Sequence, residues 1–354
     1  MTYLITVIIP IHNGKNVIEN NLKSLLNQTI NFENIEVILI DDCSTDSSLN
    51  LIKKYSQKYN NIKTIHLTEN YGSPGNPRNI GINESSSKYI MFLDQDDYYL
   101  NDMCEKLYEK IKEEKVDFIS CLYYLKSEKN LENKKTVSNP LEKYGLELKI
   151  HNITEIPLLF EVFNPHAIMV WNKIYKKSFL IKNNIKFPKK CLSEDLYFTL
   201  QCFINGEFML LNNYFGYVYV LDDSSTSHTP SKNILYKLLC GYNMIFQYLK
   251  NKNYKVPKLI SNQMVYWTFL FLENKLSFET QKDLLKMAKP FYENFNLNYK
   301  IINNSSFLIS LQNFFIKIFS SQIYLSIIFV KIYQLFKINK IYKKIYYFHL
   351  RNIE

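Results

Sequence analysis

Glycine, proline and arginine are scarce in this sequence. Its 354 residues include 8 glycines and 10 prolines, which excludes collagen-like and low-complexity chains. Arginine occurs twice, as Arg78 and Arg351, although lysine is abundant. This preference for lysine over arginine indicates a bias of the genome's composition rather than selection for function. The positions of the two arginines are therefore candidates for functional residues.

Paired cysteines and long hydrophobic runs are also lacking. The six cysteines, at positions 43, 104, 121, 191, 202 and 240, form no CxxC pair. A chain of this length can bury a core without disulfides, so we expect free thiols in a reducing compartment. The longest charge-free apolar run near the C-terminus, residues 318–330, is 13 residues long, which is too short to span a bilayer. The first ten residues lack the basic segment and the cleavage site of a signal peptide. We therefore expect a cytosolic protein.

The composition is that of a folded protein with a basic end. Hydrophobic residues make up 47% and charged residues 21%, which excludes a disordered charged chain. The length favours two domains, or one large domain with an extension. The net charge is +10, and residues 310–354 carry seven basic residues against one acidic residue. Their lysines alternate with apolar residues at helical spacing. This predicts contact with an anionic membrane surface or, alternatively, helices packed on the rest of the chain with solvated lysines. No accompanying motif favours nucleic acid.

The first 125 residues alternate between two hydrophobic periods. Continuous apolar runs predict strands, and apolar residues at helical spacing predict helices between them. The predicted strands are 4–11, 35–40, 62–67, 88–93 and 118–125, and the predicted helices are 16–28, 46–58, 76–83 and 101–114. This alternation is typical of an α/β fold with a parallel sheet, whose ligands bind beyond the carboxyl ends of the strands.

The rest of the sequence divides into three regions. Residues 126–144 are polar and predict a loop or insertion, whereas residues 168–220 mix strand and helix patterns. After residue 231 the pattern is almost entirely that of amphipathic helices, over 234–250, 258–276 and 279–291, followed by the basic tail. We find no internal repeat.

An acidic cluster follows the predicted strand 88–93. Asp94 and Asp96 stand two residues apart in the sequence Asp-Gln-Asp-Asp. Hard oxygen ligands in this arrangement suit Mg²⁺ or Mn²⁺, which would in turn bind phosphate oxygens. The alternative is a solvated turn in which an aspartate caps the next helix.

Two further polar clusters follow the first and second predicted strands. Asp41 and Asp42 end strand 35–40 and could accept hydrogen bonds from a base or a ribose. The alternative is a cap for the next helix, a role that Ser44 or Asp46 could also fill. His12, in the loop after the first strand, could stack on a base or be an ordinary loop residue. No GxGxxG motif follows that strand, so dinucleotide binding is disfavoured.

Arg78 follows a glycine- and proline-rich loop that leads into the predicted helix 76–83. Backbone amides at such a helix start can meet phosphate, and a guanidinium adds a fork of donors for the same oxygens. The alternative is a structural salt bridge.

Six stretches in order resemble family 2 glycosyltransferases, which are inverting nucleotide-sugar enzymes with the GT-A fold. They are VIIPIHNGKNVIENNLKSLLNQT, EVILIDDCSTDSS, NYGSPGNPRNIGI, SKYIMFLDQDD, VWNKIYKKSFL and KFPKKCLSEDLYFTLQ. Together they cover about residues 4–223. The sequence departs from the family at His12, where the family usually has tyrosine.

The resemblance implies roles for individual residues. It implies that the nucleotide sugar contacts Pro10, His12, Asn13, Glu19, Asp41, Asp42, Gly72, Arg78, Asp94 and Gln95, with uridine as the usual nucleoside and Arg78 near the diphosphate. Asp96 would hold Mn²⁺ or Mg²⁺, with Asp94 beside it. His228, in the loop after the last predicted strand, is a further candidate for the metal or diphosphate, or alternatively an exposed loop residue.

The resemblance also assigns the reaction itself. Glu194 and Asp195 match the family's Glu-Asp motif, with Asp195 as general base for the acceptor hydroxyl. Alternatively, they are ordinary acidic residues in the first turn of a helix. Trp171 and Lys173 are candidates for the acceptor side, and core packing is the favoured alternative for Trp171.

The sequence therefore predicts a metal-dependent inverting glycosyltransferase. We expect a GT-A domain over residues 1–225, with nucleotide-sugar binding in about 1–125 and the acceptor side in about 150–225, and a helical region over 226–354. The expected donor is a UDP-sugar, and the expected acceptor is a growing surface glycan of capsule, lipooligosaccharide or teichoic type at the inner face of the cytoplasmic membrane. The alternatives are a catalytically silent glycan-binding or scaffold protein on the same fold and, with less support, a sugar nucleotidyltransferase.

Overall fold

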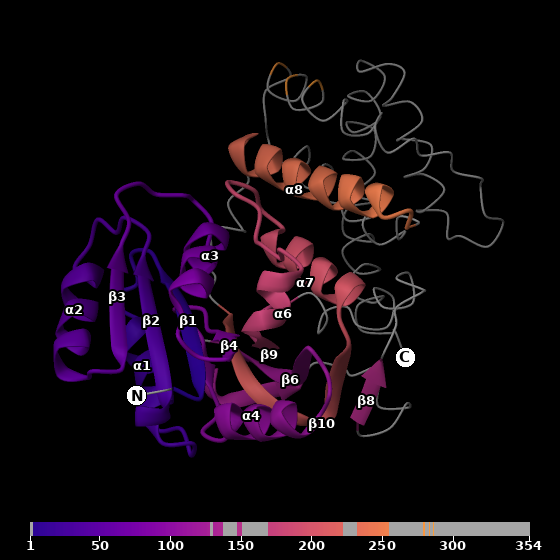
Figure 1. Cartoon of the computed structure of the whole chain (residues 1–354). Coiled ribbons are helices and arrows are strands. Elements are labelled where there is room, and N and C mark those ends of the chain that lie inside the picture. Colours follow the sequence, from indigo (N-terminus) through magenta and orange to yellow (C-terminus); the bar gives the residue numbers. More distant parts are fainter. Residues whose placement is uncertain are drawn as a thin grey trace. The chain divides into compact units, whose positions relative to one another are not determined.

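The computed structural model describes residues 3–127, 130–136, 147–150, 169–221 and 232–254, together with the single residues 279, 283 and 286. The chain forms two compact units, Met1–Asp223 and Ser224–Glu354 (Figure 1). His228, the basic tail 310–354, the predicted helix 258–276 and all but three residues of the predicted helix 279–291 lie outside the described residues.

The first unit begins with alternating strands and helices, as the hydrophobic pattern predicts. The elements up to the fourth long strand are β1 (Ile5–Ile11), α1 (Ile18–Leu26), the short 3₁₀ helix η1 (Phe32–Asn34), β2 (Ile35–Asp41), α2 (Ser48–Lys58), β3 (Ile62–His66), α3 (Gly75–Glu84) and β4 (Tyr89–Phe92). Every residue of β1 and of β2 is buried. Such strands are typical of parallel sheets that are covered on both faces.

The remaining elements of this unit build the second half of the sheet. They are β5 (Tyr98–Tyr99), α4 (Met103–Glu113), β6 (Phe118–Ser127), β7 (Asn130–Thr136), β8 (Glu147–Ile150), β9 (Lys173–Lys176), α6 (Lys177–Lys182), α7 (Glu194–Asn205) and β10 (Phe208–Leu221). In the second unit the structure describes helix α8 (Lys232–Asn251), which confirms the helix predicted over 234–250.

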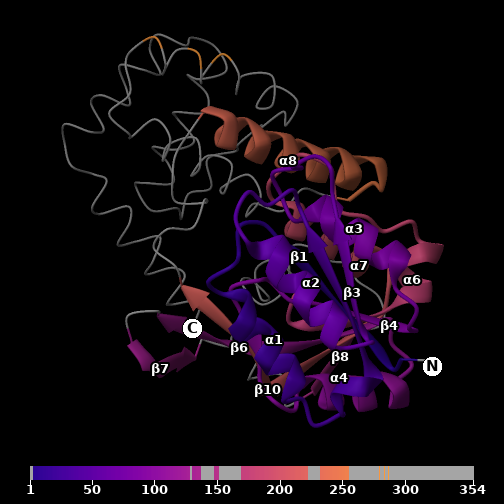
Figure 2. The same cartoon turned by 90° about the vertical axis from the view of Figure 1, so that its left-hand side faces the viewer.

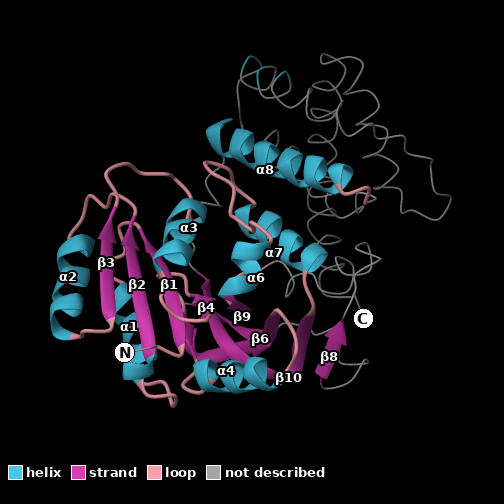
Figure 3. Ribbon diagram, in the orientation of Figure 1, coloured by secondary structure: helices cyan, strands magenta, loops and turns pink. Residues whose placement is uncertain are grey.

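One mixed sheet organises the first unit. The strand order is β3-β2-β1-β4-β9-β6-β10-β5, with β7 paired to β6 and β8 paired to β10 (Figures 2 and 3). Strands β3, β2, β1 and β4 are all parallel to one another, whereas β9 runs antiparallel to both β4 and β6. The expected parallel sheet is therefore present in the first half, and β9 reverses direction at its centre.

Helix α3 lies directly against β1 and β2. A Cβ atom at Gly81 would collide with Ile8 Cγ2 and lie 3.0 Å from Ile40 Cδ1. The absence of a side chain at Gly81 thus allows the close approach to the sheet of this helix, which carries Arg78.

The prediction of a loop over residues 126–144 is wrong for its first part. Strand β6 continues to Ser127, and β7 returns antiparallel to it. The sequence of β7, Asn-Leu-Glu-Asn-Lys-Lys-Thr, has no apolar alternation, because a strand at the margin of a sheet can be held by backbone pairing without a buried face. Residues 137–146 lie outside the described residues.

Candidate functional site

The carboxyl ends of β1, β2 and β4 meet at one edge of the sheet. These strands are parallel neighbours, with β1 in the middle. The loops that follow them therefore lie together, and they carry His12 to Gly14, Asp42 to Asp46 and Asp94 to Asp97. The rule that parallel sheets place ligands beyond their carboxyl ends predicts this edge as the site.

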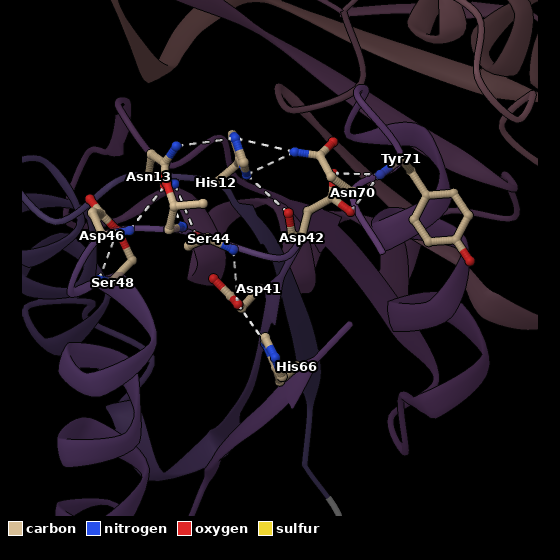
Figure 4. Close-up of polar contacts among 11 residues, drawn as sticks. His12, Asn13, Asp41, Asp42, Ser44, Asp46, Ser48, His66, Asn70 and Tyr71 are labelled. Atoms are coloured by element: carbon tan, nitrogen blue, oxygen red, sulfur yellow. Dashed lines mark hydrogen bonds and ion pairs between the residues drawn. The ribbon is translucent and has the colours of Figure 1, made fainter. Parts of the chain in front are cut away.

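His12 is the centre of a polar network on the side of this edge formed by the ends of β1 and β2. Its ring lies between Asn13 and Asn70, and its Nδ1 lies 2.9 Å from the carbonyl oxygen of Asp42 (Figure 4). Because a carbonyl oxygen only accepts, Nδ1 carries the proton and Nε2 is the acceptor. The side-chain nitrogens of Asn13 and Asn70 each lie 3.2 Å from Nε2 and donate to it.

The two asparagines are held in orientation by backbone amides. Asn13 Oδ1 accepts from the backbone nitrogens of Thr45 at 2.8 Å and Asp46 at 3.3 Å, and Asn70 Oδ1 accepts from Gly72 N at 2.5 Å. Both amide nitrogens are therefore committed to His12. Asn13 has a φ of 52°, a left-handed conformation that asparagine tolerates better than most residues.

Gln95 joins the loop after β4 to the loop after β1. Its Oε1 accepts from His12 N at 2.9 Å, and its Nε2 donates to the His12 carbonyl at 3.1 Å. A Cβ atom at Gly14 would lie 2.6 Å from Gln95 Oε1. Glycine at this position is therefore what lets the side-chain amide of Gln95 reach the backbone of His12.

Asp41 and Asp42 have different surroundings. Asp41 is fully buried, and its Oδ2 lies 2.7 Å from Nδ1 of His66, whose side chain is 43% exposed. Both carboxylate oxygens of Asp42 accept from Tyr71 N, at 3.0 and 3.2 Å. Burial raises the pKa of Asp42, while the amide of Tyr71 opposes that change. Asp42 is thus tied to the loop that leads into α3.

Arg78 lies at the centre of a second cluster, which joins the end of β4 to the start of α7. Its Nη2 lies 2.6 Å from Asp94 Oδ1, and its Nη1 lies 2.6 Å from Asp195 Oδ1. The arginine side chain is 1% exposed, and the two carboxylates are 26% and 22% exposed. The arginine therefore joins the end of β4 to the first turn of α7, and the salt-bridge alternative for this residue is what the structure contains.

The carboxyl groups of Glu194 and Asp195 titrate far above their ordinary range. Burial raises the pKa of Glu194 to about 7, and the neighbouring charge of Asp195 adds to the effect. Burial also raises the pKa of Asp195 to about 6, although the positive charge of Arg78 opposes it. At neutral pH Asp195 is therefore mostly ionised.

Asp97 and Tyr217 were not predicted as site residues, yet they hold the acidic loop. Asp97 is 1% exposed. Its Oδ2 accepts from the Tyr217 hydroxyl at 2.6 Å, and its Oδ1 accepts from Val220 N at 2.7 Å. The Tyr217 hydroxyl also lies 3.4 Å from Asp94 N. The tyrosines at 217 and 219, spaced for one face of a strand, were the only signal of this support in the sequence.

Asp96 is exposed at this edge. Among the described residues there is no group of three or more His, Cys, Asp or Glu side chains that could hold a metal ion by themselves. Asp96 and Asp94 nevertheless supply hard oxygen atoms. Mg²⁺ in particular is commonly held by one or two carboxylates together with substrate phosphates, so these residues fit a cation that binds with a diphosphate.

Four other predicted site residues are either buried or lie on the surface of helix α1. Trp171 is 2% exposed and stacks on Tyr217, with ring centroids 3.9 Å apart, as in its core-packing alternative. Lys173 is fully buried and donates from Nζ to Asn172 Oδ1 at 2.7 Å, and burial lowers its pKa to about 7. Pro10 is buried within β1, and Glu19 is exposed on α1.

Comparison with known proteins agrees with this architecture. Residues 6–179 match the model of glycosyl transferase family 2. This chain contains a family 2 glycosyltransferase domain. The matched range includes the loops after β1, β2 and β4 and all of α3, and it ends before α7.

Curated relatives of this glycosyltransferase domain act on different acceptors, according to their names. The chain is 30% identical over 244 residues to a poly(ribitol-phosphate) beta-glucosyltransferase of Bacillus spizizenii, covering 65% of this chain and 34% of the relative. It is 29% identical over 255 residues to a cholesterol galactosyltransferase of Borreliella burgdorferi, covering 71% of this chain and 68% of the relative. The chain spans about a third of the length of the first of these relatives.

The fold is also that of a solved glycosyltransferase. Residues 1–349 of Staphylococcus aureus TarS, in complex with UDP-GlcNAc, superpose with a TM-score of 0.68 at 20% identity, covering 95% of this chain and 92% of that one. This likeness establishes the GT-A fold. Within the described parts of the chain, no helix is both long and apolar enough to cross a membrane.

Proposed function

We propose that this protein is an inverting glycosyltransferase that moves a sugar from a UDP-sugar to a hydroxyl group of a surface glycan. The observation that carries the proposal is the junction at Arg78, which brings the carboxylate of Asp195 to the acidic loop after β4. A carboxylate base and a diphosphate site must lie close together for a one-step displacement at the sugar.

In the proposed reaction, Asp195 acts as general base. It takes the proton of the acceptor hydroxyl as that oxygen attacks C1 of the sugar, the bond from C1 to the diphosphate oxygen breaks, and UDP leaves with the electron pair. The pKa of Asp195, about 6, suits this role near neutral pH, because a base is most effective when its pKa is near the operating pH. Attack opposite to the leaving group inverts the configuration at C1.

The proposed cofactor is Mn²⁺ or Mg²⁺, held by Asp96 and Asp94. A divalent cation would supply positive charge to the departing diphosphate. The exposure of Asp96 at this edge and the hard oxygen atoms of both carboxylates support a cation that binds together with the diphosphate of the donor. His228, which lies outside the described residues, stays a prediction for this site.

For the nucleotide side we propose that the network around His12, Asn13, Asn70 and Asp42 receives the nucleoside. The polar side chains of these residues lie at the carboxyl ends of β1 and β2. Open α/β sheets bind their ligands beyond the carboxyl ends of the strands, which supports this assignment. The TarS structure that shares the fold holds UDP-GlcNAc, which supports uridine here.

The proposed acceptor is a glycan of teichoic type, because the first curated relatives are named for poly(ribitol-phosphate). A relative with a similar sequence identity to this chain is named for cholesterol. The acceptor and the donor sugar therefore have to be identified by activity assays. We further propose that the reaction takes place at the cytoplasmic face of the membrane, with the basic residues of 310–354 facing anionic lipid.

Thermal unfolding with UDP, GDP, CDP and ADP, each with and without Mn²⁺, tests the proposal. A nucleotide present at about 100 times its dissociation constant adds about 2.7 kcal/mol of stability, and we expect this for UDP with Mn²⁺. Asp96→Asn is the matched variant, in which the effect of Mn²⁺ should disappear. UDP-glucose, UDP-galactose and UDP-GlcNAc are then assayed for transfer to poly(ribitol phosphate). Failure of every nucleotide to stabilise the protein would favour the silent scaffold.

A further inference from the structure

We infer that Arg78 is a positioning residue that holds the base Asp195 against the acidic loop after β4, rather than a ligand of the diphosphate. The inference rests on the proposed function, in which Asp195 takes the acceptor proton. It assigns to the arginine a different task from the one that the family resemblance implies.

The burial of Arg78 argues against direct phosphate binding. Its side chain is 1% exposed, and each terminal nitrogen already lies 2.6 Å from a carboxylate oxygen. A guanidinium that binds phosphate presents a fork of free donors to the ligand. Here the fork is divided between two aspartates, Asp94 and Asp195, which come from different elements.

The third donor of Arg78 gives an independent sign of a constrained geometry. Its Nε is buried and has no hydrogen-bond partner among the described residues. Buried donors in proteins are nearly always paired, and an exception calls for an explanation. This geometry offers an explanation. The side chain is oriented so that Nη1 and Nη2 reach the two carboxylates, and in that orientation Nε has no acceptor.

The surroundings of Arg78 hold helix α3 firmly against the segment before α7. The side-chain amide of Asn79 makes a reciprocal pair with the backbone of Phe187: Nδ2 donates to the carbonyl and Oδ1 accepts from the amide, both at 2.9 Å. The ring of Phe187 stacks on Phe198 of α7, with centroids 4.0 Å apart, and the guanidinium lies 5.3 Å from the same ring. Arg78 is thus placed by a rigid support.

The contact with Arg78 also orients the carboxylate of Asp195. Oδ1 is engaged by Nη1, so Oδ2 is the oxygen left to accept the acceptor proton. A lysine at position 78 would keep the positive charge, but its single nitrogen cannot form the same planar bridge between two carboxylates. Charge and geometry can therefore be separated by substitution.

The experiment compares wild type, Arg78→Lys, Asp195→Asn and the double variant. UDP affinity is measured by calorimetry with Mn²⁺, and turnover with the UDP-sugar and acceptor that the wild type uses. Misplacing a reacting group by about 1 Å costs on the order of 10²-fold in rate, so we expect Arg78→Lys to lower kcat by about that factor. We expect its UDP dissociation constant to change by less than about threefold, since a residue that contacts no donor atom changes kcat without changing binding.

The double variant separates positioning from a general structural role. If Arg78 acts through Asp195, Arg78→Lys lowers the residual rate of Asp195→Asn by less than about threefold, because groups that act as a unit give non-additive losses. Lys63→Met, which removes a lysine from the exposed pair with Glu84, is the control and should leave both quantities unchanged.

Two results overturn the inference. One is a UDP affinity that falls about tenfold or more in Arg78→Lys with kcat preserved, which is the behaviour of a phosphate ligand. The other is a double variant in which Arg78→Lys lowers the rate of Asp195→Asn by the same factor by which it lowers the rate of the wild type. Failure of the proposed function is distinct from both, because it would appear as a wild-type protein that neither binds UDP nor transfers sugar.

Discussion

The proposed nucleotide side of the site, around His12, and the proposed reaction side, around Arg78, are built from different interactions. Around His12, exposed asparagine side chains bind backbone amides and the imidazole ring. Around Arg78, buried or half-buried charges bind one another, with two ion pairs at 2.6 Å. The two sides meet at the acidic loop, where Gln95 binds the backbone of His12 and Asp94 binds Arg78.

The difference predicts how each side responds to substitution. A side chain removed from a solvated network leaves groups that water can satisfy, so the loss is modest. Removing one partner of a buried ion pair leaves an uncompensated charge, which is far more costly. Substitutions on the reaction side should therefore change the chemical step and stability, and those on the nucleotide side should change UDP affinity.

The largest expected effect is that of Asp195→Asn. An amide cannot take the acceptor proton, and general-base catalysis contributes about 10²–10⁴-fold to a rate, so we expect a loss of that size in kcat. UDP affinity should stay within about twofold, because the side chain contacts Arg78 rather than the nucleotide loops. Steady-state kinetics and calorimetry measure the two quantities.

Survival of a tenth of the wild-type rate in Asp195→Asn would exclude Asp195 as the base. Glu194→Gln is the matched variant in the same helical turn. It should retain more activity, because Asp195, rather than Glu194, is the carboxylate that Arg78 holds at 2.6 Å.

The next effect concerns pH. Burial raises the pKa of Glu194 to about 7 and that of Asp195 to about 6, so between these values and about pH 4 the folded protein binds protons that the unfolded chain does not. Acidification through this window should lower the transfer rate, because the base becomes protonated. It should also add stability from these two groups, since folding then takes up protons.

Urea unfolding at about pH 7.5 and about pH 5.5 measures the stability part of this prediction, in wild type and in Glu194→Gln. We expect the gain on acidification to be smaller in the variant, which has lost one of the two titrating groups. An equal gain in both proteins would show that Glu194 titrates normally. Rates measured over the same range should fall as the pH passes below about 6.

Local patterns predicted the edge of the sheet, but they could not predict the pairing at its reaction side. Continuous apolar runs identify β1, β2 and β4, and the clusters at their ends follow directly. The contact between Arg78 and Asp195 joins residues 117 positions apart. This contact depends on how closely α3 approaches the sheet and on the residue at which α7 begins. The hydrophobic periodicity of the sequence predicts neither.

Elements without a hydrophobic period were missed for a related reason. Leu131 is the only apolar residue of strand β7, and β5 has only two residues, so backbone pairing with their neighbours is what makes them strands. The support of Asp97 by Tyr217 likewise spans 120 positions. A tyrosine in a predicted strand indicates that its ring packs in the core. The partner of its hydroxyl group is known only once the strands are assembled into the sheet.

On the nucleotide side, Asn13→Ala should weaken UDP binding by about tenfold while kcat changes by less than about threefold, since the contact organises binding rather than chemistry. The substitution removes the acceptor of two backbone amides in the loop after β2. Asn31→Ala is the control, because Asn31 also has a positive φ, 66°, and accepts from a backbone amide away from the site. A comparable loss of UDP affinity in both variants would assign the effect to backbone strain.

The smallest effect tests the junction between the two sides. A methyl group at Gly14 would lie 2.6 Å from Oε1 and 3.0 Å from Cδ of Gln95, and it meets no other group as closely. Gly14→Ala should therefore displace the Gln95 amide and cost about 1 kcal/mol, the usual worth of such hydrogen bonds. In a Gln95→Ala background the same substitution should cost almost nothing, because the colliding atoms are gone. Urea unfolding of the four proteins measures this coupling. Equal costs in both backgrounds would mean that the two loops are joined by something other than the contact of Gln95 with His12.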